Sequence, residues 1–384
     1  MGALLGLLGV QWLDSVMNFV ATVYVRLFQL LAVPTIVLAV TTTLVSLGGE
    51  QGAGRIFRRA LSYTLLTTFA AAAVGLLLFI AVAPGTLQGD MLAQGSEAVG
   101  ETPQVSYSSH LLGIIPNNIV KPLLEGNVLS LLLLAAAVGL ALGRMPQTDR
   151  KTAVVNLLLG LQELLFTLIR GLIWTLPVGI VAFSAQLVAQ LETSVAAESL
   201  GKYVAVVLGG NLLQFFVVLP LFLLARGLNP IKTLGRMMPA VLMALFTKSS
   251  AATLPVTMET AEERLGVSPK VARFVLPICT TINMNGCAAF ILVTSLFVMQ
   301  QGGVELTWPL MLMWLIISVV SAVGNAGVPM GCYFLTLSLM AGQNMPLAVM
   351  GLILPIYTII DMVETAVNVW SDSCVAAMTD HDLE

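Results

Sequence analysis

The stretch DMVETAVNVWSD, residues 361–372, places three carboxylates and an asparagine inside an otherwise apolar part of the sequence. On a helix with about 100° per residue, Asp361, Glu364, Thr365, Asn368 and Asp372 fall within an arc of about 100°. Each carboxylate would cost on the order of 2.5–3.5 kcal/mol at the centre of a bilayer. This polar stripe therefore needs partners or a wet cavity inside the protein; the alternative is a helix end that faces lipid headgroups.

The composition is that of an integral membrane protein. Hydrophobic residues make up 58% of the chain and charged residues 10%, whereas soluble domains carry about 25% charged residues. We therefore expect a lipid bilayer as the solvent. No basic cluster is interleaved with aromatic residues, which argues against nucleic-acid binding. The sequence has no HExxH, GxSxG or paired-histidine arrangement, so we do not predict a membrane-embedded enzyme.

Long apolar runs predict an all-α protein with several spans, at 19–47, 62–83, 126–143, 153–190 and 203–226. From residue 233 onward, Gly, Pro, Ser and Asn interrupt the apolar stretches. Irregular backbone at membrane depth has to be buried in protein or line a cavity, so we expect the polar pathway in this part. The start, MGALLGLLGVQWLD, is too short to span and is interpreted as the remnant of a first helix or as an interfacial segment.

Charges in the connections predict two re-entrant hairpins. Basic clusters at 55–59, 144–151, 226–236 and 264–273 alternate with acidic or neutral connections, and basic loops stay in the cytoplasm. The clusters at 226–236 and 264–273 then lie on the same side of the membrane. Segment 237–263 must therefore enter the membrane and return to that side, with its tip at 249–255. Segment 307–345, interrupted at 324–331, predicts a second hairpin from the opposite face.

Each predicted hairpin is followed by a span with a polar break, at 283–286 and at 361–372. An inverted repeat of this kind places substrate and ions near the midplane of the bilayer; kinked ordinary helices are the alternative. Oxygen atoms of Asp372, Asn368 and Asn283, with free carbonyls of broken helices, suit a hard monovalent cation. Free N–H groups near Ser249 suit an α-carboxylate, and Asp361 suits an α-ammonium group.

The four cysteines, Cys279, Cys287, Cys332 and Cys374, lie in or beside apolar segments and form no CxxC pair. We interpret them as small buried apolar residues and do not expect a disulfide framework or a metal site.

Four segments carry a resemblance: TKSSAATLPVT (247–257), TINMNG (281–286), GNAGVPMG (324–331) and DMVETAVNVWSD (361–372). They resemble the signature segments of the sodium-coupled dicarboxylate/amino-acid symporters, the glutamate-transporter family, in order and spacing. Weaker similarity extends over residues 20–380.

The resemblance implies a bowl-shaped homotrimer in the bacterial inner (plasma) membrane. A trimerisation scaffold would comprise 20–50 and 115–225, and a transport domain that moves like an elevator would comprise 51–114 and 226–384. Within the latter, hairpin 1 is expected at 233–265, a broken helix at 270–300, hairpin 2 at 307–345 and the last helix at 346–380.

The resemblance also implies binding residues for a small amino acid and for two or three co-transported Na+ ions. The substrate residues would be Ser249, Ser250, Cys287, Val328, Gly331, Asp361, Glu364, Thr365 and Asn368. One sodium site would use Asp372, Asn368, Asn283 and the Cys279 carbonyl; a second would use carbonyls around Thr281, Ala322, Val323 and Asn325; a third would use Thr67, Thr68, Asn283 and Asn285.

Departures from the family pattern change the expected substrate. Members that carry acidic substrates have Arg where this chain has Glu364, and a carboxylate there would repel aspartate, glutamate or dicarboxylates. We therefore expect a neutral, Ser/Thr/Ala-like substrate, as in the similar serine/threonine carriers. We expect Lys248 to pair with Glu364; alternatively, Glu364 faces a cationic or hydrogen-bonding substrate side chain.

Two further departures concern the sites themselves. Asn285 replaces an Asp of many members and weakens the third sodium site, and Cys287 replaces a Thr that contacts substrate. A proton-coupled or exchange carrier of dicarboxylates or other amino acids remains the alternative function.

Overall fold

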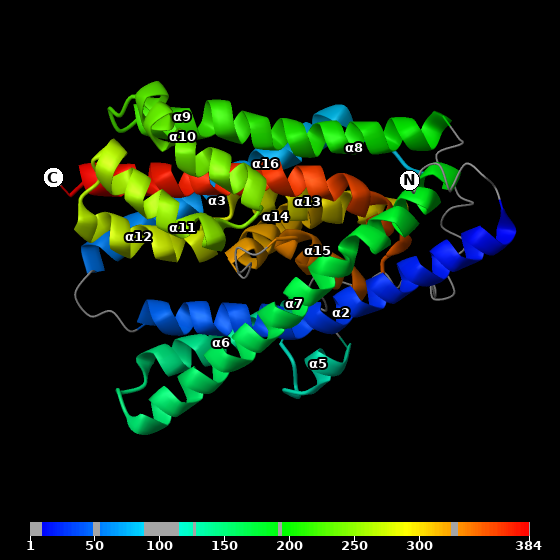
Figure 1. The fold of residues 1–384 in the computed structure, drawn as a ribbon, viewed down its shortest axis with the longest axis horizontal. Coiled ribbons are helices and arrows are strands. Elements are labelled where there is room, and N and C mark those ends of the chain that lie inside the picture. Colours follow the sequence, from blue (N-terminus) through cyan, green and yellow to red (C-terminus); the bar gives the residue numbers. More distant parts are fainter. Residues whose placement is uncertain are drawn as a thin grey trace.

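The computed structural model describes residues 10–48, 54–87, 115–125, 128–190, 194–323 and 329–383. Over these ranges the secondary structure is helical, without a strand (Figure 1). Five described helices are long and apolar enough to cross a membrane: Arg55–Val82, Asp149–Ile169, Glu198–Leu224, Pro269–Gln301 and Ala348–His381. The prediction of an all-helical chain with several apolar helices is confirmed.

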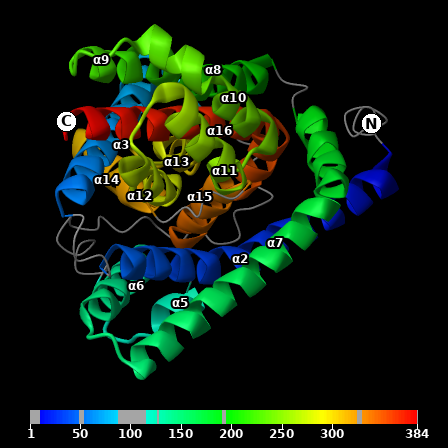
Figure 2. The ribbon, with the colours of Figure 1, turned by 60° about the vertical axis from the view of Figure 1, so that its left-hand side comes forward.

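One group of helices packs along one side of the main bundle (Figures 1 and 2). It contains α2 (Gln11–Gly48), α5 (Lys121–Glu125), α6 (Val128–Arg144) and α7 (Asp149–Gln190), with α2 packed along both α6 and α7. Gly139 allows α6 to approach α2 closely, because a Cβ atom there would lie 2.7 Å from the Leu44 Cβ and 2.9 Å from the Thr41 carbonyl oxygen.

The main bundle is built around α13, which is buried along its length, as a helix with small and apolar residues on every face should be. Helices α3, α8, α14, α15 and α16 all pack against α13. The bundle comprises α3 (Gly54–Val82), α8 (Ser194–Leu213), η2 (Gln214–Val218), α9 (Leu219–Leu224), α10 (Pro230–Thr247), α11 (Ser250–Thr260), η3 (Ala261–Leu265), α12 (Pro269–Ile282), α13 (Asn285–Gln301), α14 (Trp308–Val323), α15 (Gly331–Gly342) and α16 (Ala348–His381).

Residues 194–224 are placed differently from the sequence prediction, which grouped them with 20–50 and 115–190. Helix α8 packs on α3, α13 and α16, and η2 packs on α3 and α16. Polar contacts explain this position, since the Trp370 Nε1–H donates to the Phe215 carbonyl at 3.1 Å and the Gln214 side chain reaches the Thr67 carbonyl at 3.1 Å. The segment therefore belongs to the bundle of α16.

Two of the predicted interruptions are present. Lys248, with φ 54°, and the extended Ser249 separate α10 from α11. Asn283 and Met284, both with non-helical backbone, separate α12 from α13. The third predicted interruption, at 324–331, falls between the end of α14 at Val323 and the start of α15 at Gly331. Residues 324–328 of this segment lie outside the described part of the chain.

The predicted break at 361–372 is wrong, because α16 is one continuous helix over Ala348–His381. This stretch contains neither glycine nor proline, and its polar side chains bond to neighbouring elements. The backbone hydrogen bonds between successive turns of α16 are therefore not interrupted in this stretch.

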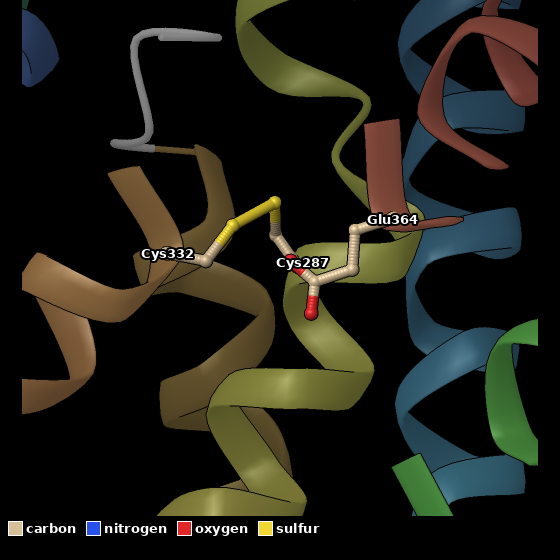
Figure 3. Close-up of side chains that lie close together, drawn as sticks. All are labelled: Cys287, Cys332 and Glu364. Carbon is tan, nitrogen blue, oxygen red and sulfur yellow. A yellow bond between two sulfur atoms is a disulfide. The ribbon is translucent and has the colours of Figure 1, made fainter. Parts of the chain in front are cut away.

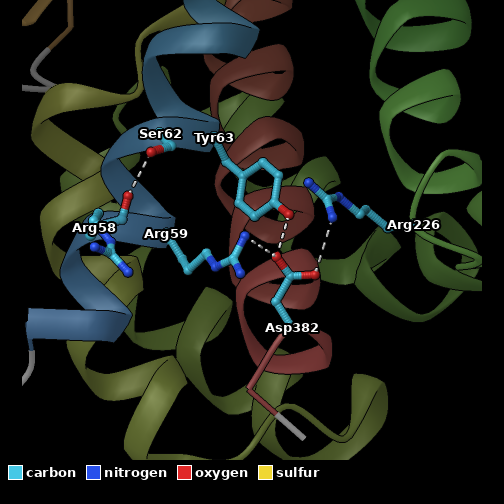
Figure 4. A network of polar contacts seen from close by, with 6 residues as sticks. All are labelled: Arg58, Arg59, Ser62, Tyr63, Arg226 and Asp382. Atoms are coloured by element: carbon cyan, nitrogen blue, oxygen red, sulfur yellow. Dashed lines mark hydrogen bonds and ion pairs between the residues drawn. The ribbon is translucent and has the colours of Figure 1, made fainter.

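Two of the four basic clusters, at 55–59 and 226–236, meet at Asp382 beside the C-terminal end of α16 (Figure 4). Asp382 lies 3.3 Å from Arg59 and 3.6 Å from Arg226, and it accepts a hydrogen bond of 2.5 Å from Tyr63. The Arg236 guanidinium donates to the Leu265 carbonyl at 3.1 Å. Segment 230–265 therefore starts and finishes at the same end of the bundle, as a helical hairpin does.

Candidate functional site

The polar side chains of α16 form a buried acidic ridge, by which we mean Asp361, Glu364, Thr365, Asn368 and Asp372. Their exposed fractions lie between 1% and 5%. None of the ion pairs found within the described ranges involves these carboxylates. The ridge thus faces protein, and its charge is not balanced by a Lys or Arg contact in that part of the chain.

The N-terminal part of the ridge meets the start of α15. The Met330 N–H donates to the Asp361 carboxylate at 3.2 Å, and Met330 has φ 64° as the residue before α15. The Tyr357 hydroxyl lies 3.5 Å from Asp361 and donates to Glu364 Oε2 at 3.1 Å. The other carboxylate oxygen of Glu364, Oε1, has no hydrogen-bond partner in the described structure. One tyrosine thus links two acidic side chains.

The predicted ion pair between Lys248 and Glu364 is absent from the residues described, so this expectation is corrected. Lys248 follows the last residue of α10 at the hairpin turn. Glu364 instead accepts from Tyr357 and lies near Cys287 and Cys332, which follow the breaks between α12 and α13 and between α14 and α15 (Figure 3).

Asn283, at the break between α12 and α13, joins three helices. Its side-chain N–H groups donate to Ser371 and to Asp372, both at 2.9 Å. Its carbonyl oxygen accepts from Thr67 at 3.2 Å and from Asn285 at 2.9 Å. Four oxygen-bearing side chains from α3, α13 and α16 therefore converge on Asn283 at this break. Such a cluster of carboxylate, amide and hydroxyl oxygens suits a hard cation.

Asn285 extends this cluster toward α3 and η2. It donates to Thr67 and Thr68, each at 3.3 Å, and accepts from Gln214 at 2.6 Å. The third predicted sodium site, Thr67, Thr68, Asn283 and Asn285, is therefore brought together by the structure. An amide replaces the carboxylate that would supply its negative charge.

Asn368 connects the ridge to the start of α13. It accepts from the Gly286 N–H at 2.9 Å and donates to the Cys287 sulfur at 3.4 Å. A Cβ atom at Gly286 would lie 2.8 Å from the Glu364 Cα and 2.8 Å from Asn211 Oδ1. Glycine is thus required for α13 to begin directly against α16.

The first hairpin turn lies beside the ridge. The Ser249 hydroxyl caps α11 by accepting from the Ala252 N–H at 3.1 Å, and Ser250 begins α11 as a buried residue. Both α10 and α11 pack against α16. Ser249 and Ser250 therefore lie at the N-terminus of a helix that packs against α16.

The remaining sodium-site predictions have mixed outcomes. The Cys279 carbonyl accepts the Asn283 N–H at 2.8 Å, and Thr281 bonds its own helix at Ile278. Ala322 is buried at the end of α14, which approaches α12. Val323 ends α14 and Gly331 begins α15. The predicted residues Asn325 and Val328 lie outside the described residues.

Cys287 and Cys332 form a disulfide in the structure, with Cα atoms 5.6 Å apart (Figure 3). This corrects the expectation that all four cysteines are simple apolar residues. The two are 45 residues apart, and only the packing of α15 against α13 brings them together. Cys279 and Cys374 are free and buried, as predicted.

Sequence reasoning did not identify four contributors: Tyr357, Gln214, Ser371 and Cys332. Tyr357 precedes Asp361 by four residues, so its place on the same helix face was available from the sequence. Gln214 is one of two amide side chains, with Asn211, in an apolar run, which is also a usable signal. Ser371 and Cys332 depend on tertiary packing.

Comparisons with known proteins show the family of this chain. A family model described as "Sodium:dicarboxylate symporter family" matches residues 1–382. The chain is 31% identical to neutral amino acid transporter B(0) of Oryctolagus cuniculus, over 94% of this chain and 73% of that protein. It is 29% identical to neutral amino acid transporter A of Homo sapiens (94% and 75%) and 27% identical to excitatory amino acid transporter 3 of Mus musculus (92% and 77%). The chain belongs to the sodium:dicarboxylate symporter family.

Proposed function

We propose that this protein is a sodium-coupled symporter of small neutral amino acids. The observation that carries the proposal is the acidic ridge: three buried carboxylates with no Lys or Arg ion pair among the described residues. Buried charges without partners are costly, so the ridge is suited to cations that arrive from solution. A sodium ion and an α-ammonium group are such cations.

The two ends of the ridge suit different cations. Asp361 receives a backbone N–H and a tyrosine hydroxyl, and has capacity left to accept from an α-ammonium group. Asp372 lies beside Asn283 and the threonines of α3, where side-chain oxygens can replace the water shell of Na+. In our proposal substrate binds at the first end and sodium at the second, with two or three sodium ions per cycle.

Glu364 supports a neutral rather than an acidic substrate. Its Oε1 atom is buried without a partner in the described part of the protein. A substrate carboxylate here would meet like charge, whereas a hydroxyl or another donor would satisfy the oxygen. Serine and threonine therefore fit better than aspartate or glutamate.

We further propose a homotrimer in the bacterial inner membrane with an elevator movement. The group formed by α2, α5, α6 and α7 would be the trimerisation scaffold. The bundle around α13 would be the moving transport domain, including residues 194–224. The arrangement of α2, α6 and α7 along one side of the bundle in Figures 1 and 2 supports this division. Segments 230–265 and 308–342 would act as re-entrant hairpins.

Thermal stabilisation of the purified protein tests the proposal. Serine, threonine, alanine and aspartate are added one at a time, in sodium buffer or in choline buffer at the same pH. A ligand at 100 times its Kd stabilises the folded state by about 2.7 kcal/mol. We expect small neutral amino acids to raise the melting temperature in sodium only. Equal stabilisation in choline would contradict sodium coupling and favour the proton-coupled or exchange carrier, and stabilisation by aspartate would contradict the substrate class.

A further inference from the structure

Three potential metal ligands meet where α13, α15 and α16 converge. The sulfur atoms of Cys287 and Cys332 and a carboxylate oxygen of Glu364 all lie within 4.8 Å of one another, and all three residues are buried (Figure 3). Cys287 is the third residue of α13 and Cys332 the second residue of α15. The cluster therefore links two helix starts to the acidic ridge.

Glu364 gives this cluster a second, independent feature. Its side chain is 1% exposed, and Oε1 has no hydrogen-bond partner among the described residues, while Oε2 accepts from Tyr357. A buried carboxylate oxygen that lacks a donor is costly to maintain. A buried carboxylate with such an oxygen, beside two sulfur atoms, supplies the donor atoms that a borderline-soft divalent cation prefers.

We propose that the reduced forms of Cys287 and Cys332, together with Glu364, bind a thiophilic divalent cation of the Zn2+ or Cd2+ class. The disulfide is the oxidised form of the same site, in which the sulfur atoms are bonded to each other and do not ligate. Transport of an amino acid with sodium does not require a bound divalent cation, so the proposal extends beyond the function proposed above, although it shares Glu364 with the proposed substrate site.

The disulfide form and the cation-bound form interconvert by reduction of the disulfide followed by release of two protons to solution. A dithiol such as dithiothreitol reduces the disulfide, giving two protein thiols and the oxidised cyclic disulfide of the reagent. A divalent cation then displaces one proton from each thiol and binds two thiolates and one carboxylate oxygen. Two thiolates at about 2.3 Å from one tetrahedral ion lie about 3.8 Å apart. The 5.6 Å spacing of the Cα atoms accommodates both forms after side-chain rotation.

An ion at this position would join three elements. It would tie the start of α15 to the start of α13 and to α16, next to Asp361, whose partner Met330 immediately precedes α15. Three protein ligands leave one position of a tetrahedral ion open for water. We therefore expect the ion to hold the 329–332 segment in place and to compete with a substrate at Asp361.

Cadmium binding to the purified full-length protein tests the site without any transport measurement. Cadmium–thiolate absorption in the ultraviolet is followed during titration of dithiothreitol-reduced and diamide-oxidised wild-type protein, each after removal of the reagent. We expect one equivalent of Cd2+ per chain with thiolate absorption in the reduced sample and none in the oxidised sample. This comparison needs no mutation, so a folding defect cannot confuse it. Absence of thiolate absorption in the reduced protein would overturn the proposal.

Variants then assign the ligands. Loss of a residue that only supports a metal ligand typically lowers metal affinity by roughly 10–100-fold. Cys287→Ser or Cys332→Ser removes a ligand itself and should lower the apparent Cd2+ affinity by more than this. Glu364→Gln should keep the thiolate absorption but bind more weakly. The double variant Cys279→Ser/Cys374→Ser is the matched control and should bind like wild type. The three-ligand site would be contradicted if Glu364→Gln bound Cd2+ with unchanged affinity. It would also be contradicted if the cadmium–thiolate absorption were lost only in the Cys279→Ser/Cys374→Ser control.

Discussion

Replacing Asn283 by alanine should destabilise the protein strongly, because Asn283 holds together the break between α12 and α13. Its side chain makes hydrogen bonds to Ser371, Asp372 and Asn285 at 2.9 Å and to Thr67 at 3.2 Å. A typical net contribution is about 0.5–1.5 kcal/mol per hydrogen bond. The four together predict a loss of about 2–6 kcal/mol in the free energy of unfolding.

Asn211 provides a matched control. It is also a buried asparagine with an exposed fraction of 0%. Its amide nitrogen donates to the Val207 carbonyl of its own helix at 3.0 Å, and its oxygen has no partner within the described residues. Asn211→Ala therefore removes one hydrogen bond and one unsatisfied atom, and should cost at most about 1 kcal/mol.

Denaturant titration of both variants in detergent, in choline buffer, measures these differences without bound sodium. The account requires Asn283→Ala to be the more destabilised of the two by more than about 1 kcal/mol. If the two variants lose the same free energy of unfolding, Asn283 does not have the central role that its contacts indicate. Repeating the titration in sodium should show stabilisation of wild type and a smaller stabilisation of Asn283→Ala.

Further predictions concern the ridge, the helix contacts and the basic end of the bundle. Asp361→Asn should abolish stabilisation by serine in sodium without lowering the melting temperature of the ligand-free protein, as differential scanning fluorimetry can check; a normal serine response would contradict the assigned role. Gly286→Ala should cost about 1–3 kcal/mol through overpacking against α16, whereas Gly235→Ala, with no atom within 4 Å of the new Cβ, should be neutral or stabilising by up to about 1 kcal/mol in denaturant titration. Tyr63→Phe removes the hydrogen bond to Asp382 and should lower the free energy of unfolding by about 0.5–1.5 kcal/mol; no change would show that this bond is not formed.

The sequence predicts the parts of this protein that depend on composition and local pattern. Apolar runs correspond to the long helices, and the breaks at Lys248–Ser249 and Asn283–Met284 follow from polar residues between apolar ones. The helical period places Asp361 and Asp372 on one face, and both are buried. These features are local, so one sequence suffices to predict them.

Other features depend on packing that no local pattern reports. The continuity of α16 through 361–372 depends on partners such as Met330 and Asn283 that satisfy the polar side chains from outside the helix. The contact between Cys287 and Cys332 depends on how α15 lies against α13. Opposite charge and the resemblance to serine/threonine carriers predict the pair Lys248–Glu364, but in the structure Glu364 accepts from Tyr357, a partner that only packing could select.

Uptake into proteoliposomes tests the central claim most directly. Purified protein is reconstituted, and accumulation of radiolabelled serine is measured with an inward sodium gradient or with choline in place of sodium, for wild type and for Asp372→Asn. The account predicts concentrative uptake by wild type that requires sodium and that Asp372→Asn abolishes. Uptake of equal size in choline, or unchanged sodium-driven uptake by Asp372→Asn, would contradict the account.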